Sequence, residues 1–195
     1  MLRAQPLVDP HRLAALGFSQ GGIFSLLIAA HDPDVKAVVA YYPVTDFPQW
    51  LAASHANLMK RLVFHMIREY FRREAEGCME EPFQTVLQQA SPLYQAERIH
   101  TPVLLLHGDQ DGAAPVDESK RLAARLAALG RDVELVVIAG GRHVFNFKHP
   151  AQAQYAWQVA LLWLARHLGT ASMSPSPTAT HTERTRVSTV AHTVP

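Results

Sequence analysis

Three residues of the types that cooperate in nucleophilic catalysis follow one another along the chain: Ser19, Asp111 and His143. A serine hydroxyl attacks a carbonyl only when a neighbouring base takes its proton, and an imidazole oriented by a carboxylate is a common base. The order serine, acid, histidine is one in which such residues occur, each in a loop after its own strand. The pattern therefore predicts a serine nucleophile, a histidine base and an orienting aspartate.

Ser19 lies in the sequence Gly17-Phe18-Ser19-Gln20-Gly21, between a short apolar run and a helical pattern. This is the setting of a sharp strand-to-helix turn that projects a nucleophile from a sheet. Side chains two residues on either side of a strained serine would collide, and we expect the glycines at 17 and 21 to avoid that collision. The amide of Gln20, at the start of the helix, would donate to an oxyanion. Alone, the pattern also fits an ordinary glycine-rich turn.

The acid has competitors. Asp111 follows the third predicted strand, as does Asp109, whereas Asp46 follows the second. Any of the three could instead cap a loop or a helix. We favour Asp111 because Asp109 is nearer the strand end, where it would brace the loop.

The base is His143, which alone among the 11 histidines lies in a glycine-rich loop directly after the last predicted strand. We expect His31, His55 and His149 at the surface. His107 ends a buried strand and is expected to be a hydrogen-bonded structural residue.

Apolar runs alternate with helical patterns, which is typical of an α/β fold with a mostly parallel sheet of about four strands and helices on both faces. The helix at the C-terminal end is expected to carry Tyr155, Val159, Leu162 and Trp163 on one side, and Gly130 to form a left-handed helix cap. The predicted strands are 12–18, 35–42, 102–107 and 132–138, and the predicted helices are 20–31, 119–129 and 151–168.

Two segments differ from this alternation, which divides the chain into a domain of residues 1–169 and a tail of 170–195. Residues 47–90 form an insertion in which apolar pairs recur every fourth residue from Leu58 to Phe71, with basic residues between them. That spacing predicts an amphipathic helix, which would cover the sheet edge or the active site, or bind a membrane surface or partner. The tail is rich in serine, threonine and proline and is expected to be disordered.

Composition excludes several classes of protein. A net charge of +1 with interspersed signs does not predict a nucleic-acid-binding face. The single cysteine, Cys78, can form no internal disulfide and has no companions for a metal site. Its acidic neighbours disfavour a thiolate, so we expect an inert thiol rather than a nucleophile. The longest apolar stretch, 23–30, is too short to span a bilayer. We expect a cytoplasmic protein, although a segment preceding Met1 could carry a signal.

Several motifs in one order resemble a known family, the catalytic domain of prolyl oligopeptidase-type serine peptidases, which are α/β-hydrolases close to the dienelactone hydrolases. The resemblance covers most of the chain from Val8 to Phe147. It is carried by residues 8–12, Gly-Phe-Ser-Gln-Gly-Gly at 17–22, Tyr-Pro-Val-Thr-Asp at 42–46, Ser-Pro-Leu-Tyr at 91–94, the segment 99–108, Asp111 with Pro115, and Gly-Arg-His-Val-Phe at 141–145.

The resemblance implies a hydrolase of peptide or ester bonds in which Ser19 forms an acyl-enzyme that water resolves. His143 would shuttle the proton, Asp111 would hold its imidazole, and no cofactor or metal would be needed. The chain departs from the family at Ala114, where valine is usual, and at Arg142 and Val144, where many members have glycine. A bulkier loop around the base could narrow the site or set substrate choice.

The larger departure precedes Ser19. A complete sheet of this family has about eight strands with the nucleophile after the fifth, whereas only one strand is predicted before Ser19. We therefore expect a fragment that lacks a second oxyanion donor and has an uncovered edge strand, open to pairing with a second copy as a homodimer. The alternative to an active hydrolase is accordingly a non-catalytic interaction module.

Overall fold

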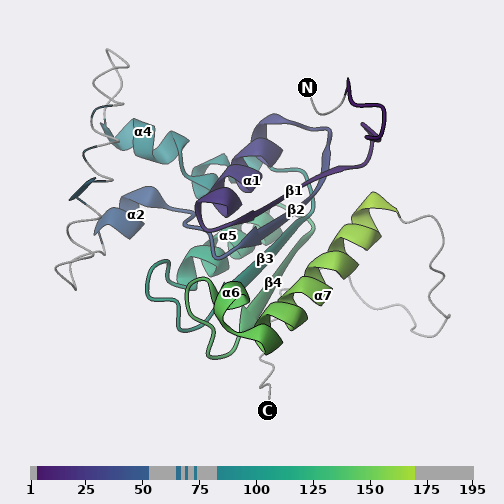
Figure 1. The fold of residues 1–195 in the computed structure, drawn as a ribbon. Coiled ribbons are helices and arrows are strands. Elements are labelled where there is room, and N and C mark those ends of the chain that lie inside the picture. The colour runs from purple at the N-terminus through teal and green to yellow at the C-terminus, as the bar shows by residue number, and fades with distance from the viewer. Residues whose placement is uncertain (1–3, 53–64, 67–68, 70–72, 74–82, 170–195) are drawn as a thin grey trace.

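Four parallel strands form the centre of the molecule. The computed structural model describes residues 4–52, 65–66, 69, 73 and 83–169. Within these residues the sheet has the order β1-β2-β3-β4, so each strand lies beside its neighbour in sequence (Figure 1). The α/β fold with a parallel sheet is confirmed. The strands are β1 (Leu13–Phe18), β2 (Val35–Tyr41), β3 (Val103–Gly108) and β4 (Val133–Ile138).

The two central strands, β2 and β3, are buried along almost their whole length, whereas β1 and β4 form the edges. Strands covered on both faces must be apolar at nearly every position, which explains the unbroken apolar runs in both. In β3, successive side chains point to opposite faces, so Val103 and Leu105 belong to one core cluster and Leu104 and Leu106 to another.

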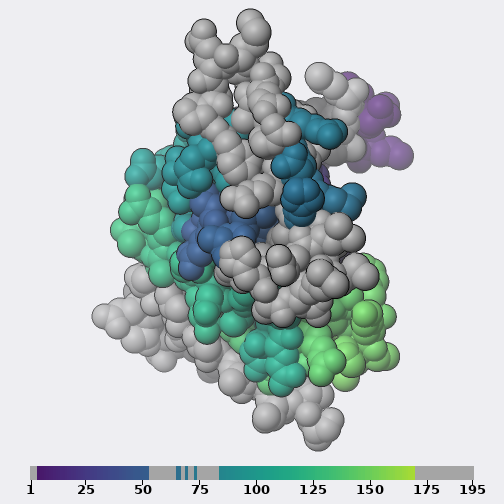
Figure 2. All heavy atoms as spheres, turned by 90° about the vertical axis from the view of Figure 1, so that its left-hand side faces the viewer, coloured from purple at the N-terminus to yellow at the C-terminus, as the bar shows by residue number. Residues whose placement is uncertain are grey.

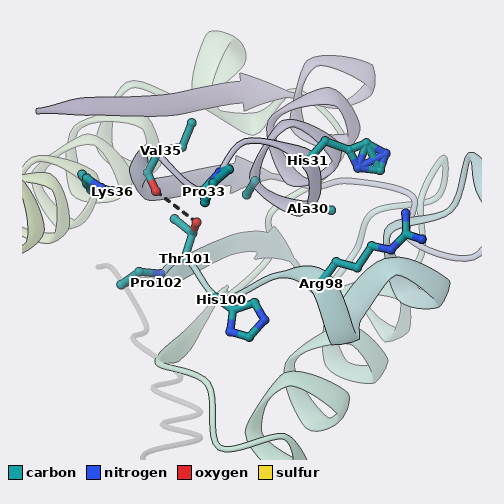
Figure 3. Close-up of a pocket in the computed structure, with 10 residues that line it drawn as sticks. Ala30, His31, Pro33, Val35, Lys36, Arg98, His100, Thr101 and Pro102 are labelled. Carbon is teal, nitrogen blue, oxygen red and sulfur yellow. Dashed lines mark hydrogen bonds between the residues drawn. The ribbon is translucent and has the colours of Figure 1, made fainter. Parts of the chain in front are cut away.

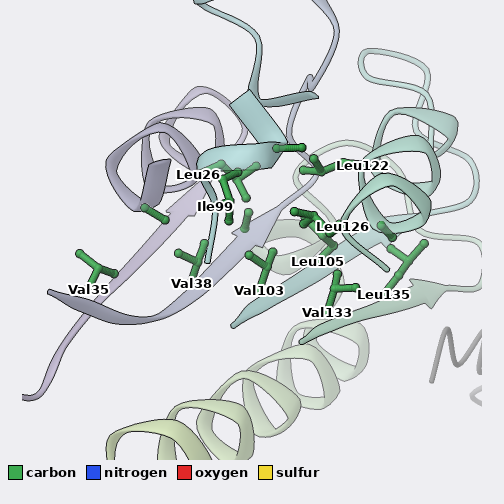
Figure 4. Packing of buried hydrophobic residues seen from close by; sticks show 14 residues of the cluster. Leu26, Val35, Val38, Ile99, Val103, Leu105, Leu122, Leu126, Val133 and Leu135 are labelled. Carbon is green, nitrogen blue, oxygen red and sulfur yellow. The ribbon is translucent and has the colours of Figure 1, made fainter. Parts of the chain in front are cut away.

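Helices cover both faces of the sheet. On one face, α1 (Gln20–His31) and α5 (Asp117–Ala128) pack over a cluster that includes Leu26, Leu105 and Leu126 (Figure 4). On the other face lies α7 (Pro150–Leu168), as Figure 1 shows. Gly130, just after α5, has a φ of 68°, which confirms the predicted left-handed position.

The buried face of α7 agrees with the prediction in part. Trp163 is buried, and Tyr155 and Val159 pack partly buried against the core, whereas Leu162 is 68% exposed. Ala156 and Ala160 complete the buried stripe. The small alanines let the helix backbone approach the sheet closely, and the carbonyl of Ala156 accepts a hydrogen bond from the buried Tyr41 hydroxyl at 3.2 Å. Hydrophobicity alone predicts that Leu162 is buried, whereas the close packing of helix and sheet places small alanines at the contact instead.

Four short elements were not predicted. They are α2 (Phe47–Ala52), α4 (Phe83–Gln89), the 3-10 helix η2 (Pro92–Arg98) and α6 (Phe145–Lys148). The first two belong to the predicted insertion and contact each other; α2 is the blue segment on the side of the molecule shown in Figure 2. The amphipathic helix predicted around residues 58–71 lies almost entirely outside the described residues, as do His55, Cys78 and the tail.

Buried Glu118, on α5, fixes the loop that follows β2. Its Oε2 accepts hydrogen bonds from the amides of Thr45 and Asp46 at 2.8 and 2.9 Å, and Arg121 forms an ion pair with its other oxygen. A buried carboxylate must be compensated in this way. In the part of the chain that the structure describes, no helix has the length and hydropathy needed to cross a membrane.

Candidate active site

Ser19 connects the end of β1 to the start of α1 in a strained turn. Its φ and ψ are 52° and −116°, in a region that non-glycine residues rarely occupy and that costs about 1–3 kcal/mol. The amide of Ser19 donates to the carbonyl of Tyr41 at 2.9 Å, which anchors the turn to β2. Although Ser19 is the N-cap of α1, its hydroxyl makes no capping hydrogen bond. That hydroxyl is directed elsewhere.

The glycines around Ser19 have unequal roles. A Cβ on Gly17 would lie 2.0 Å from the carbonyl oxygen of Gly21, so position 17 cannot carry a side chain without a shift of the backbone. A Cβ on Gly21 would meet nothing within 4 Å, so the prediction of a collision at position 21 is wrong. The second close approach occurs instead at Gly22, whose Cβ would lie 3.1 Å from the carbonyl oxygen of Tyr41.

The structure brings Ser19, His143 and Asp111 into one hydrogen-bonded chain. The Oγ of Ser19 lies 3.0 Å from Nε2 of His143, and Nδ1 of His143 lies 2.7 Å from Oδ2 of Asp111. An ionised carboxylate can only accept, so the proton of a neutral imidazole lies on Nδ1. Nε2 is then free to accept the hydroxyl proton of Ser19, which is the arrangement that a general base requires.

The surroundings of Asp111 keep it ionised. Its carboxylate is fully buried, and burial alone would raise its pKa. The imidazoles of His107 and His143 and the backbone amide of Ala114 outweigh burial, so the pKa of Asp111 lies well below its usual range. Oδ1 accepts hydrogen bonds from the amides of Ala113 and Ala114 at 2.8 and 2.9 Å. Asp111 is therefore a fixed negative charge beside His143.

The other two aspartates that we considered have separate partners. Oδ1 of Asp109 accepts a hydrogen bond from the amide of Gly140 at 2.8 Å, which braces the loop. Oδ1 of Asp46 accepts from the amide of Gln49 at 3.1 Å, at the start of α2. Among the residues that the structure describes, neither of them forms a hydrogen bond or an ion pair with His143, whose carboxylate partner is Asp111.

His107 has the structural environment that we expected. Its side chain is fully buried at the end of β3, with Nδ1 2.7 Å from the Ser119 hydroxyl and Nε2 2.8 Å from the carbonyl of Ala114. Nε2 lies 3.6 Å from Oδ2 of Asp111, beyond direct hydrogen-bonding distance. His107 thus holds the loop that carries Asp111. His31 and His149 are exposed, as predicted.

The loop that carries His143 is in close contact with the loop after β3. A Cβ on Gly108 would lie 2.1 Å from the carbonyl oxygen of Gly141, which leaves room for backbone only. The amide of Gln110 donates to that same carbonyl at 2.9 Å. The loop after β3 and the loop after β4 are therefore in contact, which brings their side chains within reach of each other.

Val144, next to His143, has a left-handed backbone with a φ of 60°. A β-branched residue is a genuine outlier in this region. The side chain of Val144 packs partly buried against the core cluster under α7. Packing therefore holds a conformation that glycine would adopt without strain.

Gln20 is the first residue of α1. The first amides of a helix have no acceptor within the helix and carry the positive end of its dipole. The Gln20 amide, directly after Ser19, is thus a candidate donor to negative charge that develops beside the serine.

Sequence reasoning missed Tyr42 and Asn146. The Tyr42 ring lies 4.7 Å from the His143 ring, centroid to centroid, and its hydroxyl donates to Oδ1 of Asn146 at 2.5 Å. The two are 104 residues apart, so no local pattern could join them. The motif Tyr-Pro-Val-Thr-Asp marked the position of Tyr42 without assigning it a role.

A pocket lies away from these residues. It measures about 320 Å³ and opens at the opposite end of the strands from Ser19, where β2 begins and where α1 ends (Figure 3). Lys36, Arg98 and His100 are among its lining residues, and Thr101 donates to the carbonyl of Val35 at 3.0 Å there. Because it contains none of Ser19, Asp111 and His143, the side-chain geometry identifies the candidate site and this pocket does not.

The sequence of this chain matches a known protein family over most of its length. The profile described as "Prolyl oligopeptidase family" matches residues 1–171. A Bacillus subtilis protein named as an uncharacterized peptidase, YuxL, is 27% identical over 172 residues, which are 86% of this chain and 24% of that protein.

Two solved structures are similar in fold and sequence. A puromycin-hydrolyzing peptidase of Mycobacterium tuberculosis is 26% identical with a TM-score of 0.68, over 85% of this chain and 23% of that one. A Klebsiella pneumoniae protein, provisionally named a dienelactone hydrolase, is 27% identical with a TM-score of 0.56, over 81% of this chain and 53% of that one. The chain thus spans about a quarter to a half of the length of these proteins.

Proposed function

The chain belongs to the prolyl oligopeptidase family, and from that membership we propose that it is a serine hydrolase that cleaves a peptide or ester bond. The observation that carries the proposal is the unbroken hydrogen-bonded path from Ser19 through His143 to Asp111, with distances of 3.0 and 2.7 Å. These distances fall within the range of a nucleophile, its base and the group that orients the base.

The proposed reaction has two halves. As Ser19 Oγ attacks the substrate carbonyl carbon, His143 Nε2 takes the hydroxyl proton and the carbonyl oxygen becomes an oxyanion. Asp111 stabilises the imidazolium that forms. His143 then gives its proton to the departing amine or alcohol, which leaves an acyl-enzyme. In the second half, His143 takes a proton from a water molecule as the water oxygen attacks the acyl carbon. His143 then gives that proton to Ser19 Oγ as the bond to the acyl group breaks, which releases the acid and restores the serine.

The oxyanion requires donors that are already in place, and the backbone amide of Gln20 is the one that we propose from this chain. An amide at a helix start needs no reorganisation as charge develops, and one such donor contributes about a hundred- to a thousand-fold in rate. Because the donor is a backbone group, only a substitution of Gln20 by proline would remove it.

The relatives of this chain include enzymes named for cleaving amide bonds and enzymes named for cleaving ester bonds. The Mycobacterium tuberculosis relative is described as a peptidase and the Klebsiella pneumoniae relative as a dienelactone hydrolase. Chemistry of the same kind serves both, because each reaction passes through a tetrahedral intermediate at a carbonyl carbon. We propose small peptides or esters as substrates and distinguish them by assay.

A fluorophosphonate probe tests the nucleophile directly, because it phosphonylates only an activated serine. We expect one probe per chain by intact mass on the wild type, and none on Ser19→Ala or after pre-treatment with a serine-directed inhibitor. Ser25→Ala is the matched control, since Ser25 lies in α1, the helix that follows Ser19, and its hydroxyl donates to the carbonyl of Gly21. Equal labelling of wild type and Ser19→Ala would disprove the proposal. Hydrolysis of a p-nitrophenyl ester against an aminoacyl p-nitroanilide then assigns the bond.

A second candidate role is an interaction module, for which the edge of the sheet provides an observation. Among the described residues β1 pairs only with β2, and Phe24 and Ile28 on the neighbouring α1 are 54% and 47% exposed. An apolar edge strand is a template for strand pairing, here with a second copy. Light scattering after size exclusion separates the candidates: a dimer without esterase activity favours this role, and an active monomer rules it out.

A further inference from the structure

We propose that Tyr42 and Asn146 form a positioning pair that holds the imidazole of His143 in line with Ser19. This inference rests on the proposed function of the Ser19 site. It assigns no proton transfer to either residue, since neither is in the hydrogen-bonded path from Ser19 to Asp111.

Tyr42 is held rigidly where β2 ends. Its side chain is fully buried, and its amide donates to the carbonyl of Leu106 at 2.8 Å. Its φ of 39° is unusual for an aromatic residue. Such a backbone strain persists only where the surroundings determine it, and it is typical of functional sites. The turn at Tyr42 directs the ring toward the loop that carries His143.

The ring and the hydroxyl of Tyr42 contact opposite ends of one segment. The ring meets the His143 ring edge-on, at 4.7 Å and 62°. The hydroxyl donates to Asn146 at the start of the next helix, three residues beyond His143. The ring of Phe145, between them, is 5.6 Å from that of Tyr42. One buried side chain thus fixes both the imidazole and the backbone that follows it.

His143 needs such support because its side chain is only partly buried, with 26% of its surface exposed. The next residue, Val144, is in the strained left-handed conformation. Hydrolysis requires Nε2 to accept a proton from Ser19 and return it to the leaving group without rotation of the ring. A misplacement of about 1 Å can cost on the order of a hundred-fold in rate.

The Tyr42 hydroxyl is suited to a fixed hydrogen bond and not to proton exchange. Burial raises the pKa of Tyr42 far above its ordinary value, more than the hydrogen bond to Asn146 lowers it. The phenol is therefore always a donor, and the Asn146 carbonyl always an acceptor. A constant hydrogen bond supplies geometry alone.

The test uses Tyr42→Phe, Asn146→Ala and the double variant, with Tyr41→Phe as the matched control. Tyr41 is the adjacent tyrosine, equally buried, and its hydroxyl also donates one hydrogen bond, but to the carbonyl of Ala156 on α7. Both tyrosine variants keep the ring and lose one buried hydrogen bond. Comparable changes in stability are therefore expected, whereas only one tyrosine contacts His143.

We expect Tyr42→Phe to lower kcat on a p-nitrophenyl ester by about three- to tenfold with KM unchanged, which is the scale of one hydrogen bond. Asn146→Ala should lower kcat similarly, and the double variant no further, because both substitutions remove one interaction. Tyr41→Phe should leave kcat within about twofold. Multiplicative losses in the double variant, or equal losses in the two tyrosine variants, would overturn the inference.

A spectroscopic measurement keeps the inference separate from the proposed function. In a proton NMR spectrum, the Nδ1 proton between His143 and Asp111 should give a resonance far downfield. This resonance should be sharp when the imidazole ring is held in place and broad when the ring moves. We expect it to broaden in Tyr42→Phe and Asn146→Ala and to persist in Tyr41→Phe, whether or not the chain hydrolyses esters. A resonance unchanged in all variants would show that Tyr42 does not position His143. Absence of probe labelling on the wild type would instead refute the hydrolase.

Discussion

The carboxylate of Asp109 accepts a hydrogen bond from the backbone amide of Gly140 across 2.8 Å, and so ties the loop after β3 to the loop after β4. Asp111, two residues further along, directs its carboxylate to His143 instead. Neighbouring acids of the same type thus have different tasks: one holds two loops together, and the other orients the base that one of those loops carries.

The two acids should respond differently to loss of charge. Asp111→Asn should lower kcat on the order of 10⁴-fold, because an amide no longer fixes the proton of His143 on Nδ1. Asp109→Asn keeps an oxygen acceptor for Gly140 and should cost less than about fivefold. Rates of ester hydrolysis or of probe labelling measure both. A severe loss in Asp109→Asn alone would reverse the assignment.

The glycines at 17 and 21 should also separate. Gly17→Ala places a methyl group 2.0 Å from a backbone oxygen and should destabilise the fold by several kcal/mol or prevent folding. Gly21→Ala fills open space within α1 and should stabilise it by about 0.5–1 kcal/mol. Urea unfolding followed by circular dichroism measures both. Destabilisation by Gly21→Ala would mean that an unseen contact occupies that space.

The left-handed backbone at Val144 gives a third matched pair. Val144→Ala and Val144→Gly lose nearly the same packing under α7, but only glycine accepts a φ of 60° without strain. We expect Val144→Gly to be more stable than Val144→Ala by about 1 kcal/mol in the same unfolding experiment. Alanine as the more stable residue would contradict the left-handed conformation.

The lowered pKa of Asp111 predicts a dependence of stability on pH. An unfolded aspartate titrates near about 3.9, and the folded Asp111 well below that, so the unfolded chain binds more protons in acid. The contribution of Asp111 is therefore present at neutral pH and is lost as the pH falls through about 4 toward the folded pKa. The difference in unfolding free energy between wild type and Asp111→Asn should narrow from pH 7 to pH 3. A constant difference would contradict the ionised, buried carboxylate.

The strands and the long helices could be predicted from the sequence because burial on both faces leaves unmistakable apolar runs. β2 and β3 are such cases. The short helices α2, α4 and α6 were missed, since four to seven residues give too little periodicity. The face of α7 was partly wrong, because alanines that allow close packing carry a weak hydrophobic signal.

The residues of the candidate site could be predicted in order and type because each follows its own strand, and parallel strands end at one edge of the sheet. Position in the loop already favoured Asp111 over Asp109, but that Asp111 contacts His143 while Asp109 holds the amide of Gly140 depends on how the two loops meet in the fold. The steric role of Gly21 and the pairing of Tyr42 with Asn146 depend on distances between segments far apart in sequence. The cytoplasmic location stays a prediction.

The guanidinium of Arg12, just before β1, donates to the carbonyl oxygens of Leu168 and Gly169 at the end of α7. These carbonyls would otherwise lack partners, as those of any final helical turn do. The first strand and the last helical turn are thereby fastened to each other. Local opening at one of them removes the partner of the other, so the two should fray as one cooperative unit.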